Sequence, residues 1–235
     1  ELLNAWKGLF AVVAQSNDLI NNLRGKVGPA VDAEVVDNVI GEAYFLRANA
    51  YFYLVRLWEN VPIIEDNQNI ESIQIPTNPR EDIYKFIEMD LEKAIELLPE
   101  KVRGIDYVSN MRVSKGSAKS ILAKVYLAES KYVEAQQMAG DVIGSGEFKL
   151  LGGTELPNMS FGDLFLTANN NNQESIFALQ WVSSANYGSG SNCNTQFGYS
   201  SYINEASYGG VFGPSQDILG AYSSSDLRRK ETFML

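Results

Sequence analysis

Apolar residues recur every three or four positions over most of the first 150 residues, which is the spacing of one face of a helix. The pattern predicts helices over about residues 2–23, 32–58, 79–98, 114–130 and 131–146. Residues that commonly cap or end helices mark the boundaries of these segments, namely Gly25, Pro79, Pro99, Ser114, Gly144 and Gly146. The sequence therefore predicts a mainly α fold.

The last two predicted helices are separated by hardly a residue, which indicates a helical hairpin. Six residues match the spacing of the tetratricopeptide hairpin: Leu122, Ala123, Tyr126, Tyr132, Ala135 and Ala139. Small side chains let the two helices approach closely, and Tyr126 is expected to fill the space beside them. Ala94 and Pro99 echo the close of a second repeat. We therefore expect residues 1–150 to form a scaffold of tetratricopeptide-like helical hairpins.

The second predicted helix contains GEAYFLRANAYFYLVRLWENVPII (residues 41–64), which is apolar on nearly every side. A helix that packs between neighbours can be apolar around most of its circumference, so we expect it to be core. Arg47 and Arg56 lie within it. An unpaired buried charge is costly, so each is expected to pair with a carboxylate such as Glu42 or Glu59, or with carbonyls at helix ends.

The two helical tryptophans, Trp6 and Trp58, lie on apolar helix faces and are expected to pack in the core or at helix ends.

After residue 150 the composition changes. No basic residue occurs between Lys149 and Arg228, and Asn, Ser, Gly and Tyr are frequent. Residues 174–182, ESIFALQWV, are predicted as a strand from their β-branched and aromatic content. The rest of 151–235 is expected to be an irregular, loop-rich Tyr/Asn/Gly region with short strands, packed on the helices. Its interleaved aromatic residues favour a packed or ligand-facing region over disorder.

Charge and composition exclude several classes of function. Nineteen basic and 29 acidic residues give a formal charge of −10, which repels polyanions, so no nucleic acid partner is expected. The chain has no histidine, the usual general base and the commonest zinc ligand. Its single cysteine, Cys193, cannot form an intrachain disulfide. No apolar run reaches the length of a membrane span.

Catalysis is not expected either. Paired carboxylates can cleave glycosides, and Glu88, Asp90 and Glu92 are close in sequence. They lie on a regular charged helix face, however, and are expected to be solvated. The sequence has no Gly-rich phosphate loop, metal-ligand cluster or nucleophile motif. A calcium ion that bridges loop carboxylates is supported by no ligand spacing, so no cofactor is expected.

Residues 41–64 resemble the signature of the SusD/RagB family of Bacteroidetes outer-membrane nutrient-binding lipoproteins, E-A-x-F-L-R-A-x-x-Y-F-x-L-V-R-x-[FWY]-G-x-V-P. The residues in register are Glu42, Ala43, Phe45, Leu46, Arg47, Ala48, Tyr51, Phe52, Leu54, Val55, Arg56, Val61 and Pro62. Glu59 and Asn60 depart from it. Four later segments resemble further family elements in order: TNPREDIYKFIEMDLEKAIELLP, MRVSKGSAKSILAKVYL with Met111 for a Gly, NNNNQESIFALQW and SSDLRRKETFM.

This resemblance implies tetratricopeptide-like helix pairs with an irregular region packed on them. It also implies that the protein captures glycans or other nutrients at the cell surface and passes them to a SusC-like TonB-dependent transporter of the outer membrane. Attachment to that membrane would be only through a lipidated N-terminal cysteine that this chain lacks. Because family members are longer at both ends, the chain is expected to be a fragment.

A neutral sugar needs aromatic faces that stack on its ring and amide groups that bond its hydroxyls. Residues 169–216 supply both, without positive charge. The candidate ligand-binding residues are Trp181, Tyr187, Asn192, Asn194, Tyr199, Tyr202 and Tyr208. The alternative for these aromatic residues is that they pin an irregular segment onto the helices. The alternative function is a helical-repeat adaptor or a peptide-binding SusD-like protein, although the hairpins end before residue 150.

Overall fold

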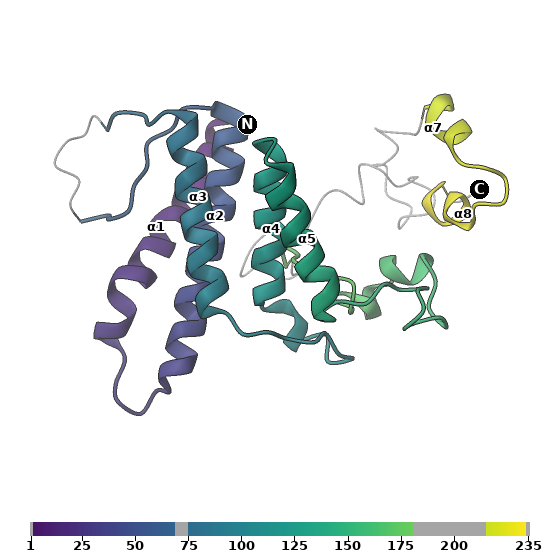
Figure 1. Cartoon of the computed structure of the whole chain (residues 1–235), viewed down its shortest axis with the longest axis horizontal. Helices are drawn as coiled ribbons and strands as arrows, with labels where there is room; N and C mark the ends of the chain where they lie inside the picture. Colours follow the sequence, from purple (N-terminus) through teal and green to yellow (C-terminus); the bar gives the residue numbers. More distant parts are fainter. Residues whose placement is uncertain (1, 69–74, 181–214, 234–235) are drawn as a thin grey trace, which may run out of the picture.

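A computed structural model describes residues 2–68, 75–180 and 215–233. Its long helices are α1 (Leu2–Lys26), α2 (Ala33–Trp58), α3 (Arg80–Leu97), α4 (Lys115–Ala128) and α5 (Tyr132–Ser145). They stand side by side, with α4 next to α3 and α5 packed on α4 (Figure 1). Shorter elements are the 3-10 helices η1 (Ser109–Met111), η2 (Gly162–Phe165) and η3 (Thr167–Asn169) and the helices α7 (Gln216–Ala221) and α8 (Leu227–Phe233). The mainly α fold predicted from the sequence is confirmed.

The helix ends follow from local chemistry. The Asp32 side chain accepts a hydrogen bond from the backbone N–H of Glu34 at the start of α2. Ser114 and Ser117 form a reciprocal capping box at the start of α4, so that two otherwise unpaired N–H groups are satisfied. Gly146 ends α5 with a φ of 69°, a left-handed conformation that glycine adopts without steric cost. The predicted caps at Ser114 and Gly146 are confirmed.

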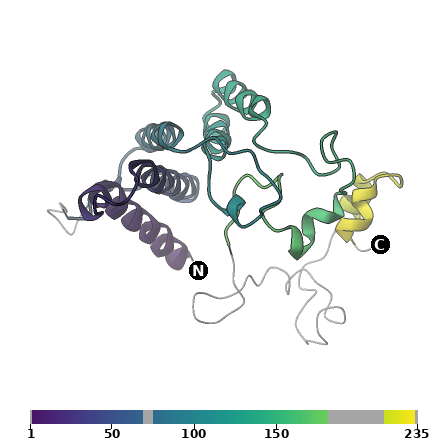
Figure 2. The same ribbon diagram turned by 90° about the horizontal axis from the view of Figure 1, so that it is seen from below.

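The core lies where α2 packs against both α1 and α3. The apolar spacing that predicted a helix at 79–98 corresponds to a buried face, because Ile83, Phe86, Ile87, Leu91 and Leu98 are buried and Ile95 is partly buried. Trp6 packs edge-on against Trp58 with ring centroids 5.2 Å apart, which confirms a packing role for both. Figure 2 views most of the helices nearly end on and shows the α4–α5 pair beside this three-helix group.

Arg47 is buried and ion-paired as expected, but its partner differs from the predicted one. Its Nε and Nη2 atoms donate to the two carboxylate oxygens of Asp90 at 2.8 and 2.7 Å, and its Nη1 donates to Asn17 Oδ1 at 2.8 Å. Asp90 is 0% exposed, so its predicted solvated position is wrong. The physical reason is its spacing: Asp90 follows Ile83 and Ile87 at helical intervals on the face that α3 turns toward the core.

The expectation that Arg56 is buried is wrong, and the carboxylate or helix-end carbonyl expected as its partner is not found among the described residues. Arg56 is exposed on α2, and its guanidinium lies 5.1 Å from the centroid of the Phe52 ring. Glu42, a partner proposed for the two arginines, accepts hydrogen bonds from Arg112 at 2.6 and 2.7 Å instead. One side of α2 is therefore exposed to solvent. Arg56 lies on this side, with its guanidinium near the Phe52 ring.

The loop after α2 is bonded to the core through Tyr51. The phenolic oxygen accepts a hydrogen bond from Ile64 N at 2.8 Å and donates one to Pro62 O at 3.3 Å. Asn17 Nδ2 donates to Ile64 O at 2.8 Å from the other side. Burial raises the pKa of Tyr51 to about 12. The hydroxyl is thus a neutral donor and acceptor that fixes the direction in which the chain leaves α2.

Replacement of Tyr51 by Phe is expected to lower the free energy of unfolding by about 1–2 kcal/mol, because it leaves the N–H of Ile64 and the carbonyl of Pro62 without this partner. Urea denaturation followed by circular dichroism measures the change. Tyr53→Phe is the matched control, since Tyr53 is 49% exposed on the same helix and should change stability by less than about 0.5 kcal/mol. Equal effects of Tyr51→Phe and Tyr53→Phe would show that the Tyr51 hydroxyl does not stabilise the loop after α2.

The predicted strand at 174–182 is not observed in residues 174–180, the part of it that the structure describes. The N–H of Ser175 donates to the carbonyl of Asn172 in a turn, and the carbonyl of Ile176 accepts from Ser117 Oγ. The isolated bridges present elsewhere in the described ranges join Val61 to Asn78 and Leu151 to Leu156. The apolar content that predicted a strand serves to pack this segment, because the Phe177 ring lies against Phe45.

Candidate functional site

The seven sequence-predicted ligand residues all lie at positions 181–208, outside the described residues: Trp181, Tyr187, Asn192, Asn194, Tyr199, Tyr202 and Tyr208. The structure does describe residues 171–180, which lead directly into that region. Two features surround these residues: a buried polar anchor and an apolar groove. Both were missed by reasoning from the sequence.

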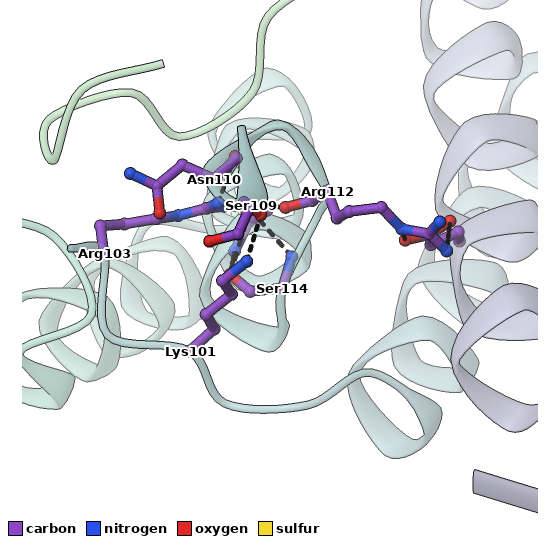
Figure 3. Close-up of polar contacts among 8 residues, drawn as sticks. Lys101, Arg103, Ser109, Asn110, Arg112 and Ser114 are labelled. Atoms are coloured by element: carbon purple, nitrogen blue, oxygen red, sulfur yellow. Dashed lines mark hydrogen bonds and ion pairs between the residues drawn. The ribbon is translucent and has the colours of Figure 1, made fainter. Parts of the chain in front are cut away.

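The polar anchor consists of Arg103, Asn110 and Ser117 with the carbonyl groups that they bind. Arg103 is only 2% exposed, although it comes from the irregular connection between α3 and α4. Its guanidinium donates to the carbonyl of Asn110, to that of Arg112 at 3.1 Å and to Ser117 Oγ at 3.2 Å. Figure 3 shows Arg103, Asn110 and Arg112 around the turn that precedes α4. The Arg103 guanidinium thus holds two carbonyls of the connection and the first turn of α4 together.

The anchor also holds the segment that leads to the predicted binding region. Ser117 Oγ donates to the carbonyl of Ile176 at 2.8 Å, and Arg103 Nη2 reaches the same carbonyl at 3.5 Å. Asn110 Nδ2 donates to the carbonyl of Asn171 at 3.0 Å. Phe177 adds an edge-on ring contact with Phe45, with centroids 5.0 Å apart. Residues 171–177 are therefore fastened to α2 and α4 by polar and apolar contacts together.

The electrostatics of the anchor identify it as structural. Burial lowers the pKa of Arg103, while the nearby carboxylate of Glu147 acts in the opposite direction. The Arg103 guanidinium also lies 5.3 Å from the centroid of the Phe148 ring. Four hydrogen bonds run from its Nη1 and Nη2 atoms to protein oxygens, its Nε is buried without a hydrogen-bond partner among the described atoms, and the residue is closed to solvent. The anchor positions the backbone and offers no free cation to a ligand.

Arg112 and Lys101 complete the connection between α3 and α4. The bidentate bond of Arg112 to Glu42 joins this connection to α2. Burial raises the pKa of Glu42, and the hydrogen bonds from Arg112 oppose that rise. Lys101 Nζ donates to the carbonyl of Ser109, and burial lowers the pKa of Lys101. Each cation here therefore fixes a carbonyl or a carboxylate of the scaffold.

The groove lies between α2, α4 and α5 and ends at residues 176–177. It has a volume of about 510 Å³. The side chains that define it are Phe52, Tyr53, Arg56, Ile121, Lys124, Val142, Ile143, Ile176 and Phe177. The sequence did contain a signal for this groove. Asn49, Tyr53 and Arg56 recur at helical spacing on an otherwise apolar helix, which indicates that this side of the helix is not covered by a neighbouring helix.

Neither a cluster of metal-ligating side chains nor a membrane-spanning helix is found among the residues that the structure describes. No group of three or more His, Cys, Asp or Glu side chains in those ranges is arranged to hold a metal ion. None of the helices described is long and apolar enough to cross a membrane. Glu88, Asp90 and Glu92 do not form an open carboxylate pair, because Asp90 is buried against Arg47 and Glu88 binds Lys131.

Paired helices that carry an anchored irregular segment define a tetratricopeptide-like helical scaffold. Residues 1–127 match the model of the SusD-like family, which is described as starch-binding and associating with the outer membrane. The chain is 36% identical to a SusD-like protein of Bacteroides ovatus over 99% of its own length. The match spans more than half of the chain, so the chain belongs to the SusD-like family.

Solved relatives share the fold. A SusD superfamily protein from Parabacteroides distasonis superposes with a TM-score of 0.76 at 28% identity, covering 96% of this chain and 47% of that one. A relative solved with a xylogluco-oligosaccharide superposes with a TM-score of 0.65 at 36% identity, covering 77% of this chain and 36% of that one. The chain spans 43% of the length of the Bacteroides ovatus relative.

Proposed function

We propose that the protein captures a neutral oligo- or polysaccharide at the cell surface and delivers it to a SusC-like TonB-dependent transporter. The observation that carries the proposal is membership in the SusD-like family, together with a relative, 36% identical over 77% of this chain, that was solved with a xylogluco-oligosaccharide. The family is associated with the outer membrane. Attachment of the whole protein there through an N-terminal lipid is part of the proposal.

We further propose that residues 1–150 act as the scaffold and that the region 151–235 provides ligand contacts through its aromatic and amide side chains. The absence of basic residues between Lys149 and Arg228 suits an uncharged ligand. The anchored segment 171–177 supports this arrangement, because a binding region is more effective when the chain that enters it is held in place. The proposed stacking residues are Trp181, Tyr187, Tyr199, Tyr202 and Tyr208, with Asn192 and Asn194 as hydrogen-bonding residues.

Affinity electrophoresis of the full mature protein through gels that contain xyloglucan, starch or laminarin tests the function. One of these polysaccharides is expected to retard the protein. Trp181→Ala should raise the Kd by about tenfold or more, because a stacked aromatic ring contributes on the order of 1–2 kcal/mol with its buried area. The matched control is Tyr53→Ala, an exposed aromatic residue of the groove, which should leave retardation unchanged.

The outcomes separate the two alternatives. If no polysaccharide retards the full protein, the glycan proposal fails and capture of a peptide becomes the favoured function. If Trp181→Ala and Tyr53→Ala weaken binding equally, the ligand site is not in the region proposed. Co-purification with a SusC-like transporter from solubilised outer membranes tests the delivery step, and recovery of the protein without any TonB-dependent transporter would contradict it.

A further inference from the structure

Glu147 is a buried acidic residue that follows α5 after Gly146. It is only 3% exposed, and its Oε2 atom has no hydrogen-bond partner among the described atoms. A carboxylate that is removed from water in this way is costly unless a positive charge or a dipole lies close to it. The groups that lie against the Glu147 carboxylate therefore decide whether it is stabilised.

The Glu147 carboxylate lies against Gly116 in the first turn of α4. A Cβ atom on Gly116 would be 2.8 Å from the Cδ atom and from both carboxylate oxygens of Glu147, which is closer than Cβ atoms approach such atoms in proteins. Gly116 is not among the described glycines with a positive φ, and glycine is a poor helix former. The glycine at this position is thus explained by the space that the Glu147 carboxylate takes.

The start of α4 also suits a negative charge. A helix N-terminus carries a partial positive charge, which an acidic residue in the first turn commonly compensates. The first turn of α4 has no acidic residue and begins with Lys115. Arg103 is close as well: its N–H donates to the carbonyl of Glu147 at 2.7 Å, and the Glu147 carboxylate acts to raise the pKa of Arg103. Glu147 therefore supplies the negative charge that α4 lacks in its own first turn.

The backbone that follows Glu147 connects this contact to the anchored segment 171–177. Two residues after Glu147, the N–H of Lys149 donates to the carbonyl of Gln173 at 3.1 Å. The polar anchor holds the same segment through the carbonyls of residues 171 and 176, on either side of Gln173. A shift of residues 147–149 would therefore be transmitted to the middle of the segment that the anchor holds near its ends.

We propose that Glu147 is a positioning residue for ligand binding. Its carboxylate, lying against Gly116, fixes residues 147–149, and these fix the segment that leads to the proposed binding region. Gly116 is required because any larger side chain would displace the carboxylate. The role in binding rests on the proposed function, whereas the contact between Glu147 and Gly116 does not depend on it.

Thermal unfolding of the full mature protein tests the contact. Gly116→Ala places a methyl group where the Glu147 carboxylate lies and is expected to lower the Tm by about 3 °C. Gly140→Ala in α5 is the matched control. No atom lies within 4 Å of the Cβ position of Gly140, and alanine is the better helix former, so this change should not lower the Tm.

A double substitution shows whether the two residues act on each other. Glu147→Ala removes the carboxylate and with it the obstacle to a side chain at position 116. Gly116→Ala added to Glu147→Ala should then leave the Tm within about 1 °C of that of Glu147→Ala alone. A further loss as large as the one that Gly116→Ala causes in the wild-type protein would overturn the proposal, because the two residues would then act independently.

Two further measurements separate positioning from a general loss of stability. The amide hydrogen of Lys149 should exchange faster in Glu147→Ala and in Gly116→Ala than in the wild-type protein. In affinity electrophoresis, both variants should raise the Kd for the polysaccharide that retards the wild-type protein by about threefold or more, because the segment must then be ordered on binding. Tyr51→Phe, which acts on the loop after α2, is the control and should change neither readout.

The outcomes distinguish this proposal from the proposed function. If no polysaccharide retards the wild-type protein, the proposed function fails, while the double substitution and the exchange at Lys149 still support or overturn the placement of residues 147–149 by Glu147. If the wild-type protein is retarded and both variants bind as tightly as it does, Glu147 does not position the binding region and the proposal is overturned.

Discussion

Replacing Asp90 by Ala is expected to lower the free energy of unfolding by about 3–5 kcal/mol, the largest effect anticipated from a single polar substitution in this protein. Asp90 is fully buried and accepts two hydrogen bonds from Arg47. Without it, the Arg47 guanidinium stays in a desolvated site with Asn17 and the rings of Phe86 and Tyr44 around it, and loses the carboxylate that is ion-paired with it.

Urea denaturation followed by circular dichroism measures this loss, and the slope of the transition shows whether the folded state is retained. Asp82→Ala is the matched control on the same helix, because its ion pair with Lys85 is exposed and should contribute less than about 1 kcal/mol. The double substitution of Arg47→Met with Asp90→Leu should recover most of the loss, since it removes both charges. A cost below about 1 kcal/mol for Asp90→Ala alone would disprove the importance of the pair.

Replacing Arg103 by Met is expected to cost about 2–4 kcal/mol, because the carbonyls of Asn110, Arg112 and Ile176 lose a charged donor in a buried site. Met keeps much of the apolar stem that packs beside Phe148, so the change isolates the guanidinium. Urea denaturation measures the change in the free energy of unfolding. The backbone amides of residues 171–177 should exchange their hydrogens faster in Arg103→Met than in the wild-type protein.

Arg228→Met is the control for this second substitution. Arg228 forms an exposed ion pair with Asp226 and should change stability by less than about 1 kcal/mol, with no effect on exchange at residues 171–177. Unchanged exchange in Arg103→Met would mean that Ser117 and Phe177 alone hold the segment. In that case Arg103 would matter only for the connection between α3 and α4.

Periodicity and capping were enough to predict the long helices α1 to α5, whereas the short helices α7 and α8 lie in a region that was expected to be irregular. Each helical hydrogen bond joins residues four apart, so the spacing of Ile83 and Ile87 or the capping box of Ser114 is readable from a short stretch of sequence. The prediction for Asp90 was wrong because it relied on the charge of neighbouring residues instead of on helical spacing. Asp90 was assigned to a charged surface with Glu88 and Glu92, although it shares the face of Ile83 and Ile87.

The strand prediction failed for a different reason. Apolar and aromatic content at 174–180 correctly indicates contact with the core, but it does not specify what bonds the backbone. The carbonyl of Ile176 is bonded by Ser117 and Arg103, which lie 59 and 73 residues away along the chain. A sequence pattern carries no information about such a long-range partner.

The sequence by itself determined the helical scaffold, its helix ends, the burial of Arg47 and the resemblance to the SusD-like family. Only the tertiary structure decided which groups compensate the buried charges: Asp90 for Arg47, backbone carbonyls for Arg103, and Glu88 with Glu129 for Lys131. The physical reason is that helix formation depends on neighbours in the chain, whereas a desolvated charge is stabilised by whichever groups folding brings within about 3 Å of it.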